Sequence, residues 1–148
     1  MKRSAQEAVL RIHSQIPHAR ICRRYLLGCA RQALHHFRRP VSSINFIITT
    51  ARKMAQMHRR YLQSAGPTDV MAFNLSENGA ALEGEVYICL EQARCQAACF
   101  GVSLASEVAR LAVHGLLHLA GEDDKTDAGR ARMRRLEDKV LRKVERAK

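Results

Sequence analysis

The most constraining feature of the sequence is the stretch AVHGLLHLAGEDD, at residues 112–124. Its first nine residues are mainly apolar, which is typical of a helix that packs inside a fold. The same segment nevertheless carries two histidines, and it is followed by a glycine and three consecutive acids. Any fold of this chain must therefore bury one apolar helix and still give two imidazoles a polar partner.

The spacing of the two histidines predicts a shared ligand. His114 and His118 are four residues apart, so a helix rotates the second only about 40° from the first and stacks both rings on one face. Gly121 is placed to end the helix in the left-handed conformation and to turn the chain back, which brings Asp124 toward the same point. The alternative is that both histidines are structural core residues and that Asp124 belongs to a solvated acidic cluster.

The pattern H-x3-H-x2-G-x2-D has the spacing of the elongated zinc-hydrolase motif, with an aspartate where a third histidine usually stands. Two nitrogen ligands and one oxygen ligand suit zinc and leave a fourth position for water. We therefore expect His114, His118 and Asp124 to bind one divalent metal ion, Zn²⁺. Gly115 stands where H-E-x-x-H proteases carry their glutamate base, which argues against a protease.

Periodicity and turn residues predict an α+β fold, a small mixed sheet packed with several helices and with the metal site on a central helix. The segments VMAFNLS and EGEVYICL are separated by a turn and are expected to pair as a hairpin. Ser103 or Ser106 is the expected cap of the histidine helix. A turn is expected at residues 64–69. The expected strands are 8–16, 41–50, 70–76 and 83–90, and the expected helices are 18–37, 51–62, 91–99, 104–120 and 126–146.

Length and composition bound the class of protein. The 148 residues suffice for one domain, residues 1–148. The chain has no run of 18 apolar residues and no apolar block of signal-peptide length after its first charges, so we expect a cytoplasmic protein that does not enter a membrane. Five irregularly spaced cysteines indicate reduced thiols. Cys95 and Cys99 have a helical spacing that suits a metal, but buried core cysteines are the more common reading.

Positive charge is concentrated at the two ends of the chain. Residues 1–60 hold 13 Lys and Arg against one acid, residues 61–124 hold two against nine, and residues 125–148 hold ten against four. This distribution favours a polyanionic partner such as RNA, although ordinary solvated surface is the alternative. The segment HHFRR at residues 35–39 adds an aromatic ring for base stacking. One helix face near the end of the chain is predicted to be basic, through Arg132, Arg135, Lys139, Arg142 and Arg146.

Three blocks of the sequence, in the correct order, resemble the YbeY-type endoribonucleases, the rRNA maturation factors. HGLLHLAGEDD resembles their H-G-x-L-H-L-x-G-Y-D-H signature, GPTDVMAF at residues 66–73 resembles P-T-D-V-L-S-F, and LEGEVYICLEQA at residues 82–93 resembles L-G-D-I-x-I-x-x-E. The resemblance covers about residues 41–140. It implies an α+β fold with a metal-bearing helix, cleavage of single-stranded RNA, 16S rRNA 3′-end processing and ribosome quality control, with rRNA and the ribosomal subunit as partners.

The chain departs from the family pattern at several positions. The third histidine of the signature is Asp124, and the aspartate of the G-D-I segment is Glu85. The family arginine expected to contact phosphate falls on Leu62, and Arg59, one helical turn earlier, is the candidate replacement. Asp69 and Glu85 are the candidate general base or partners of the metal ligands, and Asp69 is alternatively a turn-capping residue.

These observations leave three functions to compare. A metal at this site supports RNA cleavage, with either water or an RNA 2′-OH as nucleophile. The loss of the arginine at position 62 and of the glutamate base also permits a non-catalytic, metal-stabilised module that binds the ribosome or RNA. A metalloprotease is the third candidate.

Overall fold

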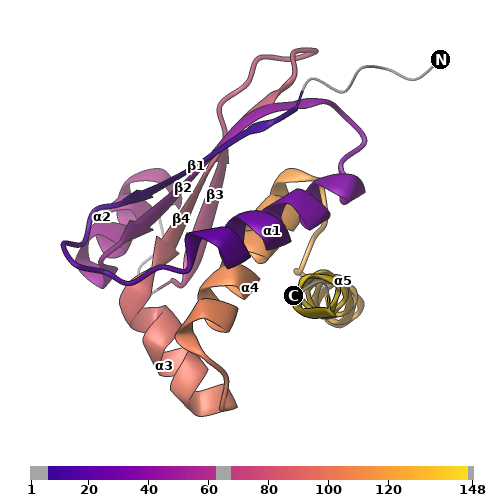
Figure 1. The fold of residues 1–148 in the computed structure, drawn as a ribbon. Helices are drawn as coiled ribbons and strands as arrows, with labels where there is room; N and C mark the ends of the chain where they lie inside the picture. The colour runs from indigo at the N-terminus through magenta and orange to yellow at the C-terminus, as the bar shows by residue number, and fades with distance from the viewer. Residues whose placement is uncertain (1–6, 63–67, 147–148) are drawn as a thin grey trace.

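The computed structural model describes residues 7–62 and 68–146 of the chain (Figure 1). Four strands form one sheet, and the helices pack around it. In chain order the elements are β1 (Val9–Ser14), α1 (Arg23–Ala33), η1 (Leu34–His36), β2 (Val41–Thr49), α2 (Ala51–Leu62), β3 (Val70–Asn74), β4 (Leu82–Cys89), α3 (Leu90–Phe100), α4 (Leu104–Leu119) and α5 (Asp127–Arg146).

The sheet is mixed, with the strand order β1-β2-β4-β3. β1, β2 and β4 are parallel, whereas β3 runs antiparallel to β4, with Val70 opposite Ile88 and Asn74 opposite Gly84. The hairpin expected from the sequence is therefore confirmed. The α+β class with a mixed sheet is confirmed as well.

Alternation along β4 decides which residues face the histidine helix. A Cβ added at Gly84 would lie 2.8 Å from Leu119, and one added at Gly115 would lie 2.6 Å from Val86. Gly84 and Val86 therefore face α4, and side chains alternate along a strand, so Glu85 and Tyr87 face the opposite side. On that side Tyr87 packs with Met54 and Met57 of α2.

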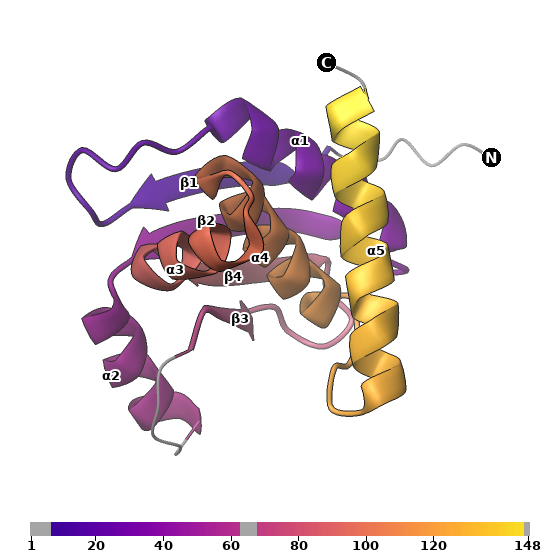
Figure 2. The same cartoon turned by 90° about the horizontal axis from the view of Figure 1, so that it is seen from below.

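Helix α4 is the central helix of the fold. Most of its residues are buried, it packs on β3 and β4, and α1, α3 and α5 contact its other sides (Figures 1 and 2). Ser103 caps it by accepting a hydrogen bond from the Ser106 backbone N–H at 3.1 Å, so Ser103 is the cap and Ser106 is not. The apolar character of residues 104–120 thus reflects true burial.

The helix expected at residues 18–37 is shorter than its periodicity indicated. It begins at Arg23 and gives way at Leu34 to a short 3-10 turn. His18 has a φ of 61°, a left-handed conformation that interrupts any regular helix, and local periodicity does not reveal it. Phe37, the ring expected to stack on RNA bases, is partly buried and packs against the hydrophobic core instead. Most of the turn expected at residues 64–69 lies outside the described residues.

Among the described residues no single helix is long and apolar enough to cross a membrane. The pair α3 and α4 reaches that length and composition only together, with a bend of 116° between them.

Candidate metal centre

Three side chains meet at the C-terminal end of α4. The Nε2 atoms of His114 and His118 lie 3.0 Å apart. The Oδ2 atom of Asp124 lies 3.4 Å from each of them. Within the described part of the chain, this is the one group of three or more His, Cys, Asp or Glu residues whose ligand atoms converge, as predicted from the sequence.

The dimensions of this triangle fit a tetrahedral metal. Zinc lies about 2.0–2.2 Å from nitrogen and oxygen ligands, so the ligand atoms of one tetrahedron lie roughly 3.3–3.6 Å apart. The observed separations of 3.0 and 3.4 Å are close to these edges. The side chains are partly exposed, which leaves the fourth corner accessible. The three residues therefore suit a divalent metal with one open position.

Glu137 of α5 orients the first histidine. Its Oε2 atom lies 3.2 Å from Nδ1 of His114, and the residue is only 7% exposed. A carboxylate there holds the proton on Nδ1 and turns the Nε2 lone pair toward Asp124 and His118. Arg110 holds the same carboxylate, with its Nη1 atom 3.5 Å from Oε1 of Glu137.

The electrostatic environment of His114 is dominated by carboxylates. Burial alone lowers its pKa, but the hydrogen bond to Glu137 and the charges of Glu137 and Asp124 outweigh burial, so the pKa of His114 lies above its usual value. Negative charge at this point favours any cation, a proton or a metal ion. The site is therefore built to hold positive charge next to the imidazoles.

The loop after α4 brings Asp124 to the histidines. The backbone N–H groups of Gly121 and Glu122 donate to the carbonyls of His118 and Leu117 at 3.0 and 2.9 Å, which is a Schellman ending with Gly121 at a φ of 100°. The expectation that Gly121 ends this helix and turns the chain is confirmed.

The start of α5 fixes the other end of this loop. Thr126 caps α5 by accepting a hydrogen bond from the Gly129 N–H at 2.9 Å. A Cβ added at Gly129 would lie 2.4 Å from the backbone oxygen of Asp123. Only glycine at this position allows the helix to approach the segment that carries Asp124.

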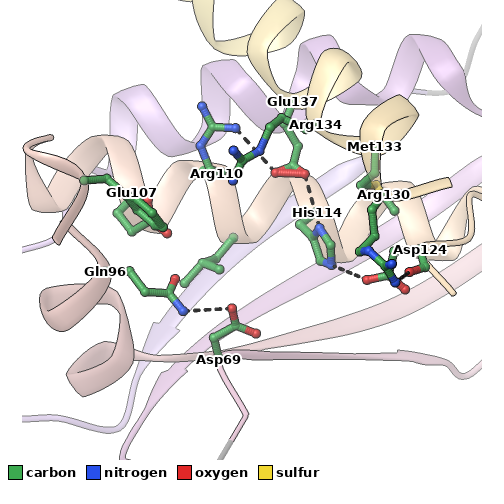
Figure 3. A pocket seen from close by; sticks show the side chains of 12 residues that line it. Asp69, Gln96, Glu107, Arg110, His114, Asp124, Arg130, Met133, Arg134 and Glu137 are labelled. Carbon is green, nitrogen blue, oxygen red and sulfur yellow. Dashed lines mark hydrogen bonds and ion pairs between the residues drawn. The ribbon is translucent and has the colours of Figure 1, made fainter. Parts of the chain in front are cut away.

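A cavity of about 270 Å³ opens beside the metal triangle, between α4 and α5 (Figure 3). His114 and Asp124 lie at one end of it, and Asp69 and Gln96 lie at the other. Its lining is formed by Asp69, Gln96, Phe100, Glu107, Arg110, Leu111, His114, Asp124, Arg130, Met133, Arg134 and Glu137. A ligand in this cavity would touch His114 and Asp124 directly.

The structure brings only one of the three residues expected to be catalytic to this cavity. Asp69 lines it, and its Oδ2 atom accepts a hydrogen bond from Nε2 of Gln96 at 3.1 Å. Glu85 lies on the sheet face turned away from α4, where it accepts a hydrogen bond from the Tyr87 hydroxyl at 2.7 Å. Arg59 is exposed on α2, the helix on that same face, and is not part of the cavity lining.

Six polar residues of the cavity were missed by sequence reasoning: Gln96, Glu107, Arg110, Arg130, Arg134 and Glu137. Two of them carry a signal in the sequence. Glu107 is seven residues before His114 and so shares its helix face. Glu137 is an acid on the apolar stripe of a basic helix, four residues after Met133, and an acid at such a position needs a buried partner.

The basic helix face near the end of the chain is exposed over most of its length, as ordinary helix surface also would be. Arg135, Lys139 and Arg142 are exposed, whereas Arg132 bonds to Glu122 at 2.9 Å. His36 of η1 faces Lys139 closely enough that burial and this charge both lower its pKa. The segment that follows α1 in the first basic flank therefore lies close to α5 in the last one.

Comparison with known sequences decides the family. The family described as Endoribonuclease YbeY matches residues 13–145. The chain belongs to the YbeY family. This match includes most of residues 1–40, where only the expected architecture, and no motif, indicated the relationship.

Curated relatives agree with this assignment. Endoribonuclease YbeY of Mycolicibacterium paratuberculosis and of Mycobacterium tuberculosis are each 34% identical to this chain over 113 residues. The alignment covers 69% of this chain and 64% of each relative, so the chain spans just under two thirds of their length. The solution structure of TM1509 from Thermotoga maritima is similar in fold, with a TM-score of 0.60 and 22% identity, and the match covers 92% of this chain and 89% of that one.

Proposed function

We propose that this chain is a metal-dependent endoribonuclease that cuts single-stranded RNA in rRNA maturation, including 16S rRNA 3′-end processing, and in ribosome quality control. The observation that carries the proposal is the triangle of His114, His118 and Asp124 at one end of an open cavity, in a member of the YbeY family. The partners would be rRNA and the ribosomal subunit, and the site of action the cytoplasm. Residues 1–148 act in this proposal as one domain.

The three ligands would hold one Zn²⁺ ion. Two imidazoles and a carboxylate in an open tetrahedral arrangement form the donor set that zinc hydrolases use. When bound, the metal supplies a Lewis acid that stabilises charge on a phosphate oxygen and acidifies water. Glu137 keeps the His114 ring in the orientation that binding needs.

The remaining residues of the cavity bind and orient the substrate. Arg134 is exposed at the cavity and forms no hydrogen bond among the described residues, so its guanidinium is available to a phosphate. Asp69 is the carboxylate of the cavity placed to accept a proton or to orient the RNA. Glu85 and Arg59 lie on the other face of the sheet, and we propose no role for Glu85 in the reaction; Arg59 would contact RNA only outside the cavity.

The structure gives a physical reason to set aside proteolysis. A glutamate base would have to follow His114, but Gly115 packs so closely against Val86 that even a Cβ would lie 2.6 Å from its side chain. A non-catalytic RNA-binding module remains the second candidate, because Glu85 and Arg59 lie away from the cavity.

The test is cleavage of a 5′-labelled single-stranded RNA by the protein before and after removal of metal with a chelator, with a duplex of the same sequence as control. We expect cleavage of the single strand, its loss on chelation, its return with Zn²⁺, and no cleavage by His118→Ala. A 2′,3′-cyclic phosphate on the upstream fragment identifies the 2′-OH as nucleophile, whereas a 3′-OH on that fragment with a 5′-phosphate on the downstream fragment identifies water. RNA binding without metal-dependent cleavage would instead support the non-catalytic RNA-binding module. Digestion of casein would support the metalloprotease.

A further inference from the structure

The cavity extends along one face of α4, well beyond the metal ligands. Glu107, Leu111 and His114 are spaced by four and three residues, so they line the same side of the helix. Seven residues separate Glu107 from His114, a distance of about 10 Å along the axis. The end of the cavity near Glu107 is thus a separate region from the metal triangle (Figure 3).

Glu107 is an acid without a hydrogen-bond partner in this region. It lines the cavity, it is only 2% exposed, and none of the described residues donates a hydrogen bond to its carboxyl group. Burial raises its pKa, and the nearby charge of Asp69 raises it further, although Arg110 acts in the opposite direction. No fully buried side-chain oxygen in the described part of the chain lacks a hydrogen-bond partner, so the carboxyl group of Glu107 opens onto the cavity, where a ligand that presents N–H groups can bind it.

The neighbouring groups at this end are also acceptors. Asp69 takes one hydrogen bond from Gln96, which leaves its other oxygen and the Gln96 carbonyl for a ligand. The guanidinium of Arg110 is already held by Glu137 and by Asp138, at 3.5 and 2.7 Å. This end of the cavity therefore offers several acceptors. Two arginines act on Glu107 through their charge: Arg110 is engaged by Glu137 and Asp138, and Arg134 is exposed.

An aromatic ring lines the same cavity, one helical turn after Gln96 on α3. Phe100, the last residue of α3, lines the cavity and is 57% exposed, which is unusual for a phenylalanine. Proteins recognise single-stranded RNA by stacking its bases on such rings and by hydrogen bonding to the exposed edges of the bases. An exposed ring beside one buried acceptor, Glu107, and two half-buried ones, Asp69 and Gln96, is the chemistry of a nucleobase site.

We propose that the region formed by Glu107, Asp69, Gln96 and Phe100 is a nucleobase subsite that prefers guanine and receives a base next to the phosphate held at the metal. This inference rests on the proposed function and adds its sequence preference. Guanine presents two adjacent donors, the N1–H and the 2-amino group, to neighbouring acceptors. Adenine and cytosine present one amino group beside an acceptor nitrogen, and uracil presents one N–H between two carbonyls.

Equilibrium binding of nucleoside 5′-monophosphates to the metal-loaded protein tests the subsite without any cleavage. We expect GMP to bind about tenfold more tightly than UMP, since a good bidentate pair gives discrimination of that order. IMP, which lacks only the 2-amino group, should lose most of this advantage. Binding of GMP, IMP, AMP, CMP and UMP within twofold of one another would overturn the proposal.

Two variants and a control locate the preference. Glu107→Gln should reduce the preference for GMP over UMP to about twofold, while Glu83→Gln, at an exposed acid of β4, should leave it unchanged. Phe100→Ala, at a surface position whose loss does not threaten folding, should weaken all five nucleotides about tenfold. A guanine preference that survives in Glu107→Gln, or affinities that are unchanged in Phe100→Ala, would contradict the assignment.

Cleavage of hexauridylate and of the same RNA with one guanine separates the two proposals. If both stand, the guanine-containing RNA is cut faster, at one bond beside the guanine. If neither RNA is cut but GMP is still preferred, the endonuclease proposal fails and the base subsite stands. If both RNAs are cut equally and GMP has no advantage, the subsite fails and the endonuclease stands.

Discussion

Glu137 is the residue that ties the metal site to the rest of the fold. It is a nearly buried acid on α5, a helix in which basic residues outnumber acids, and it is held between Arg110 and the Nδ1 atom of His114. Glu137→Gln keeps the size of the side chain but removes the charge that orients and polarises the imidazole. We expect zinc affinity to fall about 10- to 100-fold, the usual cost of losing such a partner, with the fold retained. Competition with a chromophoric chelator measures this, and an affinity within twofold of the wild type would refute the role.

Glu107 gives the stability of the protein a pH dependence of known sign. The pKa of its carboxyl group is raised above its ordinary value of 4.5 in the folded chain. At pH values between the ordinary and the raised pKa, the folded state holds a proton that the unfolded state has released, so the free energy of unfolding falls as pH rises.

Glu107→Gln removes this dependence. The free energy of unfolding of the variant, relative to that of the wild type, should increase as pH rises above 4.5 and become constant below it. Urea denaturation at a series of pH values checks this, with Glu83→Gln as the control. A difference that does not change with pH would show that Glu107 is not perturbed by burial.

At the scale of elements, the contact between α5 and the loop at Asp123 determines where Asp124 lies. Gly129→Ala places a methyl group against the Asp123 carbonyl, a backbone atom that moves only with the loop. We expect a loss of about 1–3 kcal/mol in stability and a clear loss of metal affinity, although no ligand is changed. Gly28→Ala in α1 is the matched control, because its Cβ would meet only the Val144 side chain, at 3.3 Å. Equal metal affinity in both variants would contradict this account of the loop.

Sequence patterns predict features that depend on residues close together in the chain, and they miss features that depend on tertiary packing. The convergence of His114, His118 and Asp124 was predictable because they lie within eleven residues, on one helix and the loop after it, so their spacing alone brings them together. The start of α1 at Arg23 was missed because the left-handed His18 is a single-residue feature that apolar periodicity does not record. Glu85 was grouped with the site because it occupies the position of the aspartate in the G-D-I segment of the family pattern. The face of the sheet on which Glu85 lies, relative to the site, depends on which face of β4 packs against α4, and the sequence does not determine this locally.

The residues that complete the cavity were harder to find for the same reason. Gln96, Glu107 and Glu137 come from three helices, and only the packing of α3 and α5 on α4 places them together. Their sequence neighbourhoods predict ordinary amphipathic helices. Glu107 and Glu137 are acids on the apolar stripes of their helices, and both are buried. This pattern singles them out in the sequence, but it does not identify their partners.

For the whole molecule, the charge distribution predicts how RNA binding responds to salt. Arg135, Lys139 and Arg142 are exposed on α5, beside η1, so affinity for a non-cleaved single strand should fall steeply as salt is raised, because counterions are released from the RNA on binding. The double reversal Arg135→Glu and Lys139→Glu should weaken binding and flatten the salt response without changing metal content. Arg52→Glu with Lys53→Glu, exposed on α2, is the control of equal charge. Equal RNA affinities of the two double variants would show that the basic face of α5 is ordinary solvated surface and does not bind RNA.

We propose that Asp124 replaces a histidine as a ligand of one metal ion. The most direct measurement is the metal content per chain of the purified protein, determined by elemental mass spectrometry for the wild type, Asp124→His, Asp124→Ala and the neighbouring control Asp123→Asn. A carboxylate and an imidazole are both competent ligands. The account therefore predicts one metal per chain in the wild type, in Asp124→His and in the control, and a loss of most metal in Asp124→Ala. Full metal occupancy in Asp124→Ala would contradict it.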